Sequence, residues 1–131
     1  MELLMKEISR CKNDVVFTGS WVARINGKLR RQPKDIDIAV TSLDGLETFG
    51  DIICGESNSL FSRDTKSRCK IDLDDTMIDI WVKDELPEYE IIKGMKFQTL
   101  KSQVEYYKHL METSDDKFFN TILTKKLGVL V

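Results

Sequence analysis

The sequence predicts an α/β (α+β) fold, in which a mixed central β-sheet carries helices mainly on one face. Short apolar or alternating segments recur before about residue 85 and are typical of strands. Apolar residues at helical spacing mark both ends of the chain, so we also expect an N-terminal helix and C-terminal helices. The expected order is helix, strand, helix, strand, a short helix or turn, two strands and two helices.

The first elements follow from their residues. The apolar residues of 2–11 recur at helical spacing, and DVVFT (14–18) is typical of a buried strand. Gly19 and Ser20 then break the strand, and Ser20 is expected to cap a helix over about 21–27. An Asn-Gly pair, which tolerates the left-handed conformation, is expected to end that helix.

The middle of the chain holds the strands that carry acidic residues. Residues 28–34 (KLRRQPK) form a basic loop, because their proline bars a helix. The next segment, 35–40 (DIDIAV), alternates and is expected to be a strand. Residues 41–66 contain a short helix or turn and a brief apolar run. Two β-like runs follow, at 67–73 and 76–83, and are expected to pair as a hairpin.

The bulk composition is ordinary for a globular protein. The 131 residues suit one domain over 1–131, with 41% hydrophobic residues and a net charge of −2. No window approaches the roughly 18 apolar residues of a membrane span, and the N-terminus does not resemble a signal peptide. We therefore expect a cytoplasmic protein without a membrane partner. The small net charge still leaves room for a local basic patch.

Cysteine and histidine give little basis for a site. Cys11, Cys54 and Cys69 show no CxxC spacing, so three reduced thiols are expected. The one histidine, His109, falls in a helical segment and is expected at the surface. Catalytic triads and His-rich metal sites are therefore poor candidates.

Two acidic residues of one expected strand are candidate metal ligands. Asp35 and Asp37 point to the same face, roughly 6.6 Å apart at about 3.3 Å per residue. Carboxylates this close repel each other, and a divalent cation is the usual remedy. Oxygen ligands without His or Cys favour Mg²⁺ or Mn²⁺. Taken alone, the Asp-x-Asp pattern also fits the solvated face of an ordinary strand.

A third acid is available in the second strand of the expected hairpin. Asp79 lies in an apolar run, where a carboxylate is costly unless it is paired or bound to a metal. Asp72 is its rival, but it lies where a strand enters a turn, a common place for Asp. Asp79 is therefore the preferred third ligand.

The turn before the second helix is a candidate phosphate site. Gly19 permits close backbone approach, Ser20 offers a hydroxyl, and a helix N-terminus presents free N–H groups. Residues 20–34 contain five basic residues and no acidic one, which suits a polyphosphate near carboxylates. Each feature has a simpler explanation, as helix capping or as a solvated loop. The basic residues are Arg24, Lys28, Arg30, Arg31 and Lys34.

The segment VVFTGSWVARINGKLRRQPKDIDIAV, with Asp79 in MIDIWV, resembles the DNA polymerase beta-like nucleotidyltransferase superfamily, in particular its small members. That family's pattern is an apolar residue, Gly, then Gly or Ser, a gap, and Asp, an apolar residue and an acid. A third acid follows on a later strand. The resemblance covers 14–40 and 67–83 well and the C-terminal helices weakly. The gap of fourteen residues between Ser20 and Asp35 is at the long end of the family's range.

The resemblance implies transfer of a nucleoside monophosphate from an NTP such as ATP to an acceptor hydroxyl, with release of pyrophosphate. It implies two Mg²⁺ ions, or Mn²⁺, held by Asp35, Asp37 and Asp79. Asp79 would lie nearest the acceptor and help to accept its proton. The residues implied in nucleotide binding are Gly19, Ser20, Arg30 and Arg31.

The acceptor and one different class of function stay open. The acceptor could be a protein, as in toxin–antitoxin pairs, an RNA or a small molecule. A protein partner or a homo-oligomer could complete the acceptor site. The alternative is a catalytically silent nucleotide-binding module of the same fold, with a regulatory or antitoxin-type role. Mg²⁺-dependent NTP binding without any product would indicate that alternative.

Overall fold

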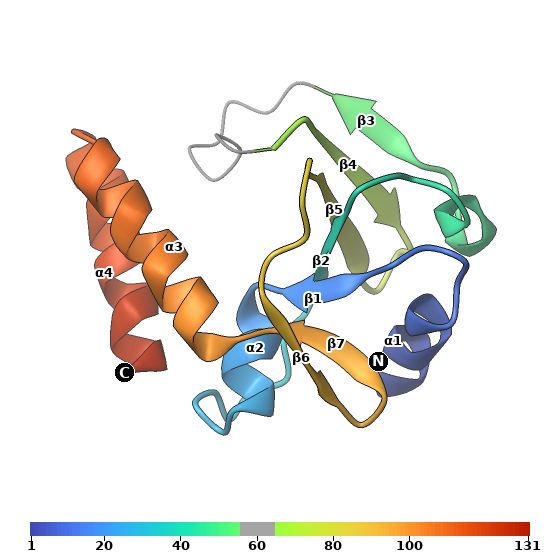
Figure 1. Cartoon of the computed structure of the whole chain (residues 1–131), viewed down its shortest axis with the longest axis horizontal. Helices are drawn as coiled ribbons and strands as arrows, with labels where there is room; N and C mark the ends of the chain where they lie inside the picture. Colours follow the sequence, from blue (N-terminus) through green and yellow to red (C-terminus); the bar gives the residue numbers. More distant parts are fainter. Residues whose placement is uncertain (56–64) are drawn as a thin grey trace.

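The computed structural model describes residues 1–55 and 65–131. Its helices are α1 (Glu2–Ser9), α2 (Ser20–Ile25), the 3-10 helix η1 (Leu46–Phe49), α3 (Leu100–Thr113) and α4 (Lys117–Leu130). Its strands are β1 (Val16–Thr18), β2 (Ile36–Val40), β3 (Ile53–Gly55), β4 (Ser67–Asp72), β5 (Met77–Val82), β6 (Tyr89–Ile92) and β7 (Met95–Gln98). These seven strands form one sheet in the order β3-β4-β5-β2-β1-β7-β6 (Figure 1).

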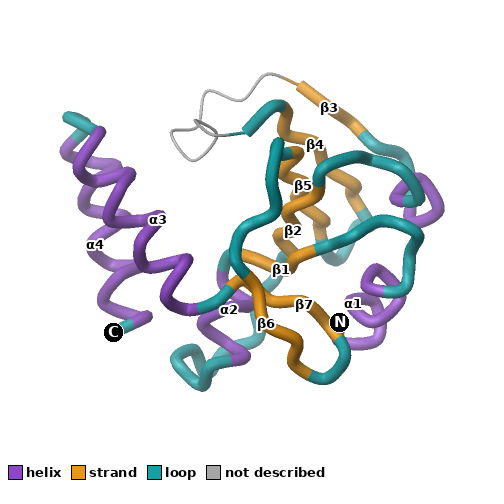
Figure 2. Tube along the Cα trace, viewed as in Figure 1, coloured by secondary structure: helices purple, strands orange, loops and turns teal. Residues whose placement is uncertain are grey.

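The sheet is mixed, as expected. β1 is antiparallel to β2, whereas β2 is parallel to β5 and β1 is parallel to β7. The remaining pairs, β3–β4, β4–β5 and β6–β7, are antiparallel. Figure 2 shows the strands between α1 on one side and the pair α3 and α4 on the other. The α+β class with a mixed sheet is therefore confirmed.

One face of the sheet carries the main core. Alternate residues of the central strands, such as Phe17, Ile38 and Ile80, are fully buried on this face. Ile8 of α1 and Trp21 of α2 pack into the same cluster, so α1 and α2 cover this face, whereas α3 and α4 pack elsewhere. Burial of each such side chain contributes about 1.5–3 kcal/mol, which fixes which face of each strand points inward.

The C-terminal helices form a second cluster beside the sheet. Leu110 of α3 and Leu123 of α4 are fully buried between these helices and α2, not on the main core face. Thr99 caps α3 by accepting from the Ser102 amide, and Asp116 caps α4 in the same way. His109 is exposed, as expected. In residues 1–55 and 65–131, every helix is too short or too polar to span a bilayer.

The hairpin β6–β7 was not predicted from the sequence. Its two-residue turn, Lys93-Gly94, has positive φ at both positions (53° and 79°), as tight hairpins require. Lys-Gly is a weaker turn signal than Asn-Gly, so the hairpin was missed. The expected cap of α2 also differs, because helix α2 begins at Ser20 itself and Gly19 is its N-cap.

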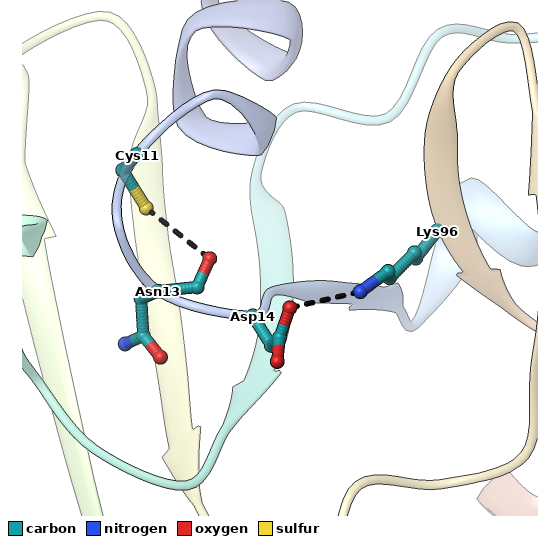
Figure 3. Close-up of polar contacts among 4 residues, drawn as sticks. All are labelled: Cys11, Asn13, Asp14 and Lys96. Carbon is teal, nitrogen blue, oxygen red and sulfur yellow. Dashed lines mark hydrogen bonds and ion pairs between the residues drawn. The ribbon is translucent and has the colours of Figure 1, made fainter.

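The expectation of three reduced thiols is wrong. Cys54 of β3 and Cys69 of β4 form a disulfide. They lie directly opposite each other in the antiparallel pair, a placement that follows from sheet register and leaves no local sequence signal. Cys11 is the free cysteine, and its thiol contacts the Asn13 carbonyl oxygen at 3.7 Å (Figure 3).

An ion pair joins the segment before β1 to the neighbouring strand. Lys96 of β7 donates to Asp14 Oδ1 at 2.9 Å (Figure 3). The side chain of Asp14 is largely exposed, so we expect this pair to contribute little to stability.

Candidate functional site

Two carboxylates lie side by side at the centre of the sheet. The parallel strands β2 and β5 are in register, and Asp37 is the direct neighbour of Asp79. Matched positions of parallel strands point to the same face. The isoleucines on either side of each Asp are buried in the main core, so both carboxylates lie on the opposite, open face of the sheet.

The two acids are electrostatically coupled. Burial, and then the charge of Asp79, raises the pKa of Asp37 to about 7. The pKa of Asp79 is also raised, chiefly by burial, although the Arg68 guanidinium opposes this shift. The interaction between the two carboxyl groups raises the pKa of Asp37 and lowers that of Asp79. A pair of oxygen donors that resists double ionisation suits a divalent cation, which would offset the repulsion.

Arg68 of β4 is a basic partner of Asp79. Its Nη2 lies 3.8 Å from Asp79 Oδ1, and its guanidinium stacks 4.4 Å from the ring centre of Trp81. The Asp79 side chain is only 15% exposed, so the Arg68 charge acts in a partly desolvated place.

The turn at Gly19 is built around the acid pair. Thr18 is the register partner of Asp37 on β1, and Gly19 follows it. A Cβ on Gly19 would lie 2.0 Å from Asp37 Oδ2, and its φ is +66°, so only glycine fits. Gln103 of α3 donates from Nε2 to the Gly19 carbonyl at 2.9 Å, which ties the turn to the C-terminal helices.

A cavity of about 250 Å³ opens beside Asp37. The strands supply one wall, α3 and α4 supply the other, and the Gly19-Ser20 turn lies between them. Two lysines and several aromatic rings give it the mixture of charge and flat apolar surface that ligand cavities use. Its lining residues include Thr18, Gly19, Ser20, Asp37, Trp81, Lys83, Gln98, Tyr106, Tyr107 and Lys126.

Asp35 lies at the edge of the acid pair, and its charge contributes to the raised pKa of both Asp37 and Asp79. It is exposed, its Oδ1 accepts from the Met77 amide at 3.2 Å, and it does not line the cavity. In the described residues, no three His, Cys, Asp or Glu side chains are grouped as ligands for a metal ion. Asp72, the rival third acid, is exposed and accepts from the Asp74 amide in the hairpin turn.

The two arginines expected near the phosphates differ in their position relative to the cavities. Arg30 and Arg31 are both exposed. Arg31 lines a second, smaller cavity of about 110 Å³, whereas Arg30 lines neither cavity. The smaller cavity adjoins the larger one, because both are lined by Gly19, Ser20, Gln103, Tyr107 and Lys126.

Several residues of the site lie on α3 and α4, for which the sequence predicts only apolar stripes. Lys126 of α4 opposes the raised pKa of Asp37 through its positive charge. The pKa of Tyr107 is raised by burial and then by Asp37, which places its hydroxyl near the acid. Gln103, only 2% exposed, shares the inner face of α3 with Tyr107 and Leu110. In the sequence, a glutamine at a position that helical periodicity turns inward is the one signal that α3 contributes to the site.

The comparisons with known proteins are sparse. No family model matches the sequence, and no curated protein matches it. Among solved structures, the crystal structure of JHP933 from Helicobacter pylori is similar, with a TM-score of 0.54 and 15% identity. The match covers 88% of this chain and 55% of that one, so the chain spans about half the length of its structural neighbour. At this identity the likeness shows a shared fold and nothing further.

Proposed function

We propose that the protein is a metal-dependent nucleotidyltransferase of the DNA polymerase beta-like type. In this proposal it transfers a nucleoside monophosphate from an NTP to an acceptor hydroxyl. The observation that carries the proposal is the contact of Asp37 with Asp79 beside the Gly19 turn, at a cavity with basic and aromatic walls. Paired acids of raised pKa next to such a cavity are typical of a functional site.

The metal would be held by the acids of the open face. Asp37 and Asp79 fit this role because they are adjacent oxygen donors, and Asp35, which immediately precedes β2, is the third acid. When bound, Mg²⁺ or Mn²⁺, most simply as two ions, supplies charge neutralisation for the phosphates and makes the acceptor hydroxyl more acidic.

The transfer forms one phosphorus–oxygen bond and breaks another. The acceptor oxygen forms a bond to the α-phosphorus of the NTP, and the bond from that phosphorus to the bridging oxygen breaks. Pyrophosphate leaves, and the hydroxyl proton passes to the Asp79 carboxylate and then to solvent. Such a reaction needs positioning and charge stabilisation more than a protein nucleophile.

The remaining cavity residues have roles in binding. Lys126 and Lys83 bring positive charge to the cavity that Gly19 and Ser20 line, which suits the triphosphate. Helix α2 has only six residues, so its N-terminus adds little to that charge. Trp81 offers the flat apolar surface against which a base or ribose can pack.

Incubation with each labelled NTP tests the proposal. The protein is supplied with Mg²⁺ or Mn²⁺ and a host extract, and labelled protein, RNA and small molecules are separated. We expect one acceptor class to gain a nucleotide, which Asp37→Asn abolishes and Asp72→Ala leaves unchanged. Equal labelling by the wild type and Asp37→Asn would contradict the assignment.

A silent nucleotide-binding module is the second candidate, and one observation favours it. Asp79 is paired with Arg68, Asp35 accepts from the Met77 amide, and neither acid lines the cavity. In that case NTP would bind in a Mg²⁺-dependent way and no fraction would become labelled.

A further inference from the structure

We infer that the basic loop 28–34 binds the phosphate backbone of a polynucleotide, and that this polynucleotide is the acceptor of the transfer. The second part rests on the proposed function, whereas the first part can be tested without it. The resemblance implies that Arg30 and Arg31 of this loop bind the NTP, but the position of the loop relative to the cavities favours a longer ligand.

The first support is charge. The chain has a net charge of −2, yet the segment from residue 19 to residue 34 has five basic residues and no acidic one. All five are exposed, and within the described residues none of them takes part in an ion pair. An unneutralised basic surface on an acidic protein is the electrostatic footprint of a polyanion site. The five are Arg24, Lys28, Arg30, Arg31 and Lys34.

The second support is that the loop is held in shape. The Arg24 guanidinium donates to the carbonyl oxygens of Leu29, at 3.3 Å, and Arg30. The Lys28 amide donates to the Ala23 carbonyl at 2.8 Å, and Pro33 is buried. These hydrogen bonds fix the loop backbone. Its charged side chains can therefore bind a ligand without the entropic cost of ordering the loop. Figure 1 shows the chain after α2 as an outward loop below the start of α3.

The third support is continuity with the acid pair. Arg31 lines the smaller cavity, which shares Ser20 and Lys126 with the larger cavity beside Asp37. A polynucleotide bound to the loop can therefore pass through the smaller cavity and bring its end to Asp37 and Asp79. Arg30, which lines neither cavity, would contact phosphates farther along the strand. A single NTP in the larger cavity would leave Arg30 and Lys34 without a role.

Binding of labelled oligonucleotides tests the inference. Fluorescence anisotropy is recorded with short mixed-sequence RNA and DNA strands, since both carry the same phosphodiester backbone. The test variant is R30Q/R31Q/K34Q, and the matched control is K6Q/K12Q/K101Q, which removes three exposed lysines elsewhere. We expect the test variant to bind about tenfold or more weakly near 100 mM salt. We also expect its salt slope to fall by about 2, since each single-strand phosphate contact contributes about 0.7. The control should match the wild type.

The RNA and DNA arms and an NTP titration sharpen the result. Tighter binding of RNA than of DNA would identify RNA as the ligand of the loop, and equal binding would identify single strands in general. Both results support the inference. Mg²⁺-dependent NTP binding should be the same in the test variant and the wild type. If NTP binding is absent from both while the oligonucleotide result holds, the proposed function fails and the basic loop keeps its ligand.

Three outcomes would overturn the inference. The wild type could fail to bind either strand at low salt, the test variant could bind as well as the control, or the test variant could lose NTP binding instead. Should the triple variant melt well below the wild type, R30Q replaces it, because that exposed side chain lines neither cavity. R30Q should then weaken oligonucleotide binding measurably, and unchanged binding would count against the loop.

Discussion

Gly19 and Asp37 approach so closely that a methyl group added to Gly19 would lie 2.0 Å from Oδ2 of Asp37. The glycine ends β1, and the acid lies in the neighbouring strand, opposite the residue before that glycine. The turn and the carboxylate therefore fit each other, and a larger residue at position 19 would displace the Asp37 side chain. This relationship joins the two parts of the Gly-Ser and Asp-x-Asp pattern in space.

Gly19→Ala should destabilise the fold by about 2–4 kcal/mol, because it adds the contact with Asp37 to the strain of a positive φ. Gly27→Ala is the matched control, since Gly27 has φ +72° but an added Cβ would meet nothing within 4 Å. It should cost about 1 kcal/mol. Urea unfolding measures both, and equal losses would show that the Asp37 contact does not matter.

Asp37→Asn should stabilise the metal-free protein near pH 8 and have little effect near pH 4. The pKa of Asp37 is about 7 in the folded state, above the ordinary 3.8, so the folded state binds the extra proton. The stability that the protonated Asp37 carboxyl group contributes is therefore fully present below about pH 4 and is lost as the pH rises through about 7. Because Asp79 shares the shift, we expect a gain of about 2 kcal/mol near pH 8. Thermal melts at both pH values check this, and a loss near pH 8 would contradict it.

Gln103→Leu should cost about 1 kcal/mol, since it removes one of two hydrogen bonds to the Gly19 carbonyl and leaves only that from the Val22 amide. Gln32→Leu, at an exposed position of the basic loop, should change the unfolding free energy by about 0.5 kcal/mol or less. Similar losses in the two variants would mean that the link from α3 to the turn is not a stabilising contact.

The disulfide gives a chemical prediction. Alkylation of the unfolded, unreduced protein should modify Cys11 alone, and reduction should release two further thiols. Reduction should also lower stability by about 3 kcal/mol, as expected for a closed loop of about 15 residues. Mass spectrometry counts the modified thiols, and three alkylated cysteines before reduction would show that the bridge between β3 and β4 is absent.

Much of the fold could be predicted from the sequence, because alternation fixes which way each strand faces. The strands around Asp37 and Asp79 alternate cleanly, and both acids do lie on the open face. Alternation does not give register between strands far apart in sequence. The direct pairing of these acids, and the cross-strand bridge of Cys54 to Cys69, therefore had no signal.

The cavity walls were less predictable. Lys126 and Gln103 reach the site only because α3 and α4 pack against α2, a tertiary arrangement that helical periodicity does not specify. Asp35 also makes a tertiary contact, its hydrogen bond from the Met77 amide at the start of β5. Spacing along the expected strand predicts that Asp35 faces the same way as Asp37, but it does not predict this partner.

The most direct test of the central claim is calorimetric titration of Mg²⁺ and an NTP into the protein, because it requires no knowledge of the acceptor. The account predicts saturable binding that needs both components, weakens at least about tenfold in Asp37→Asn and in Asp79→Ala, and is unchanged in Asp72→Ala. Binding that is absent from the wild type, or that survives both substitutions, would contradict it.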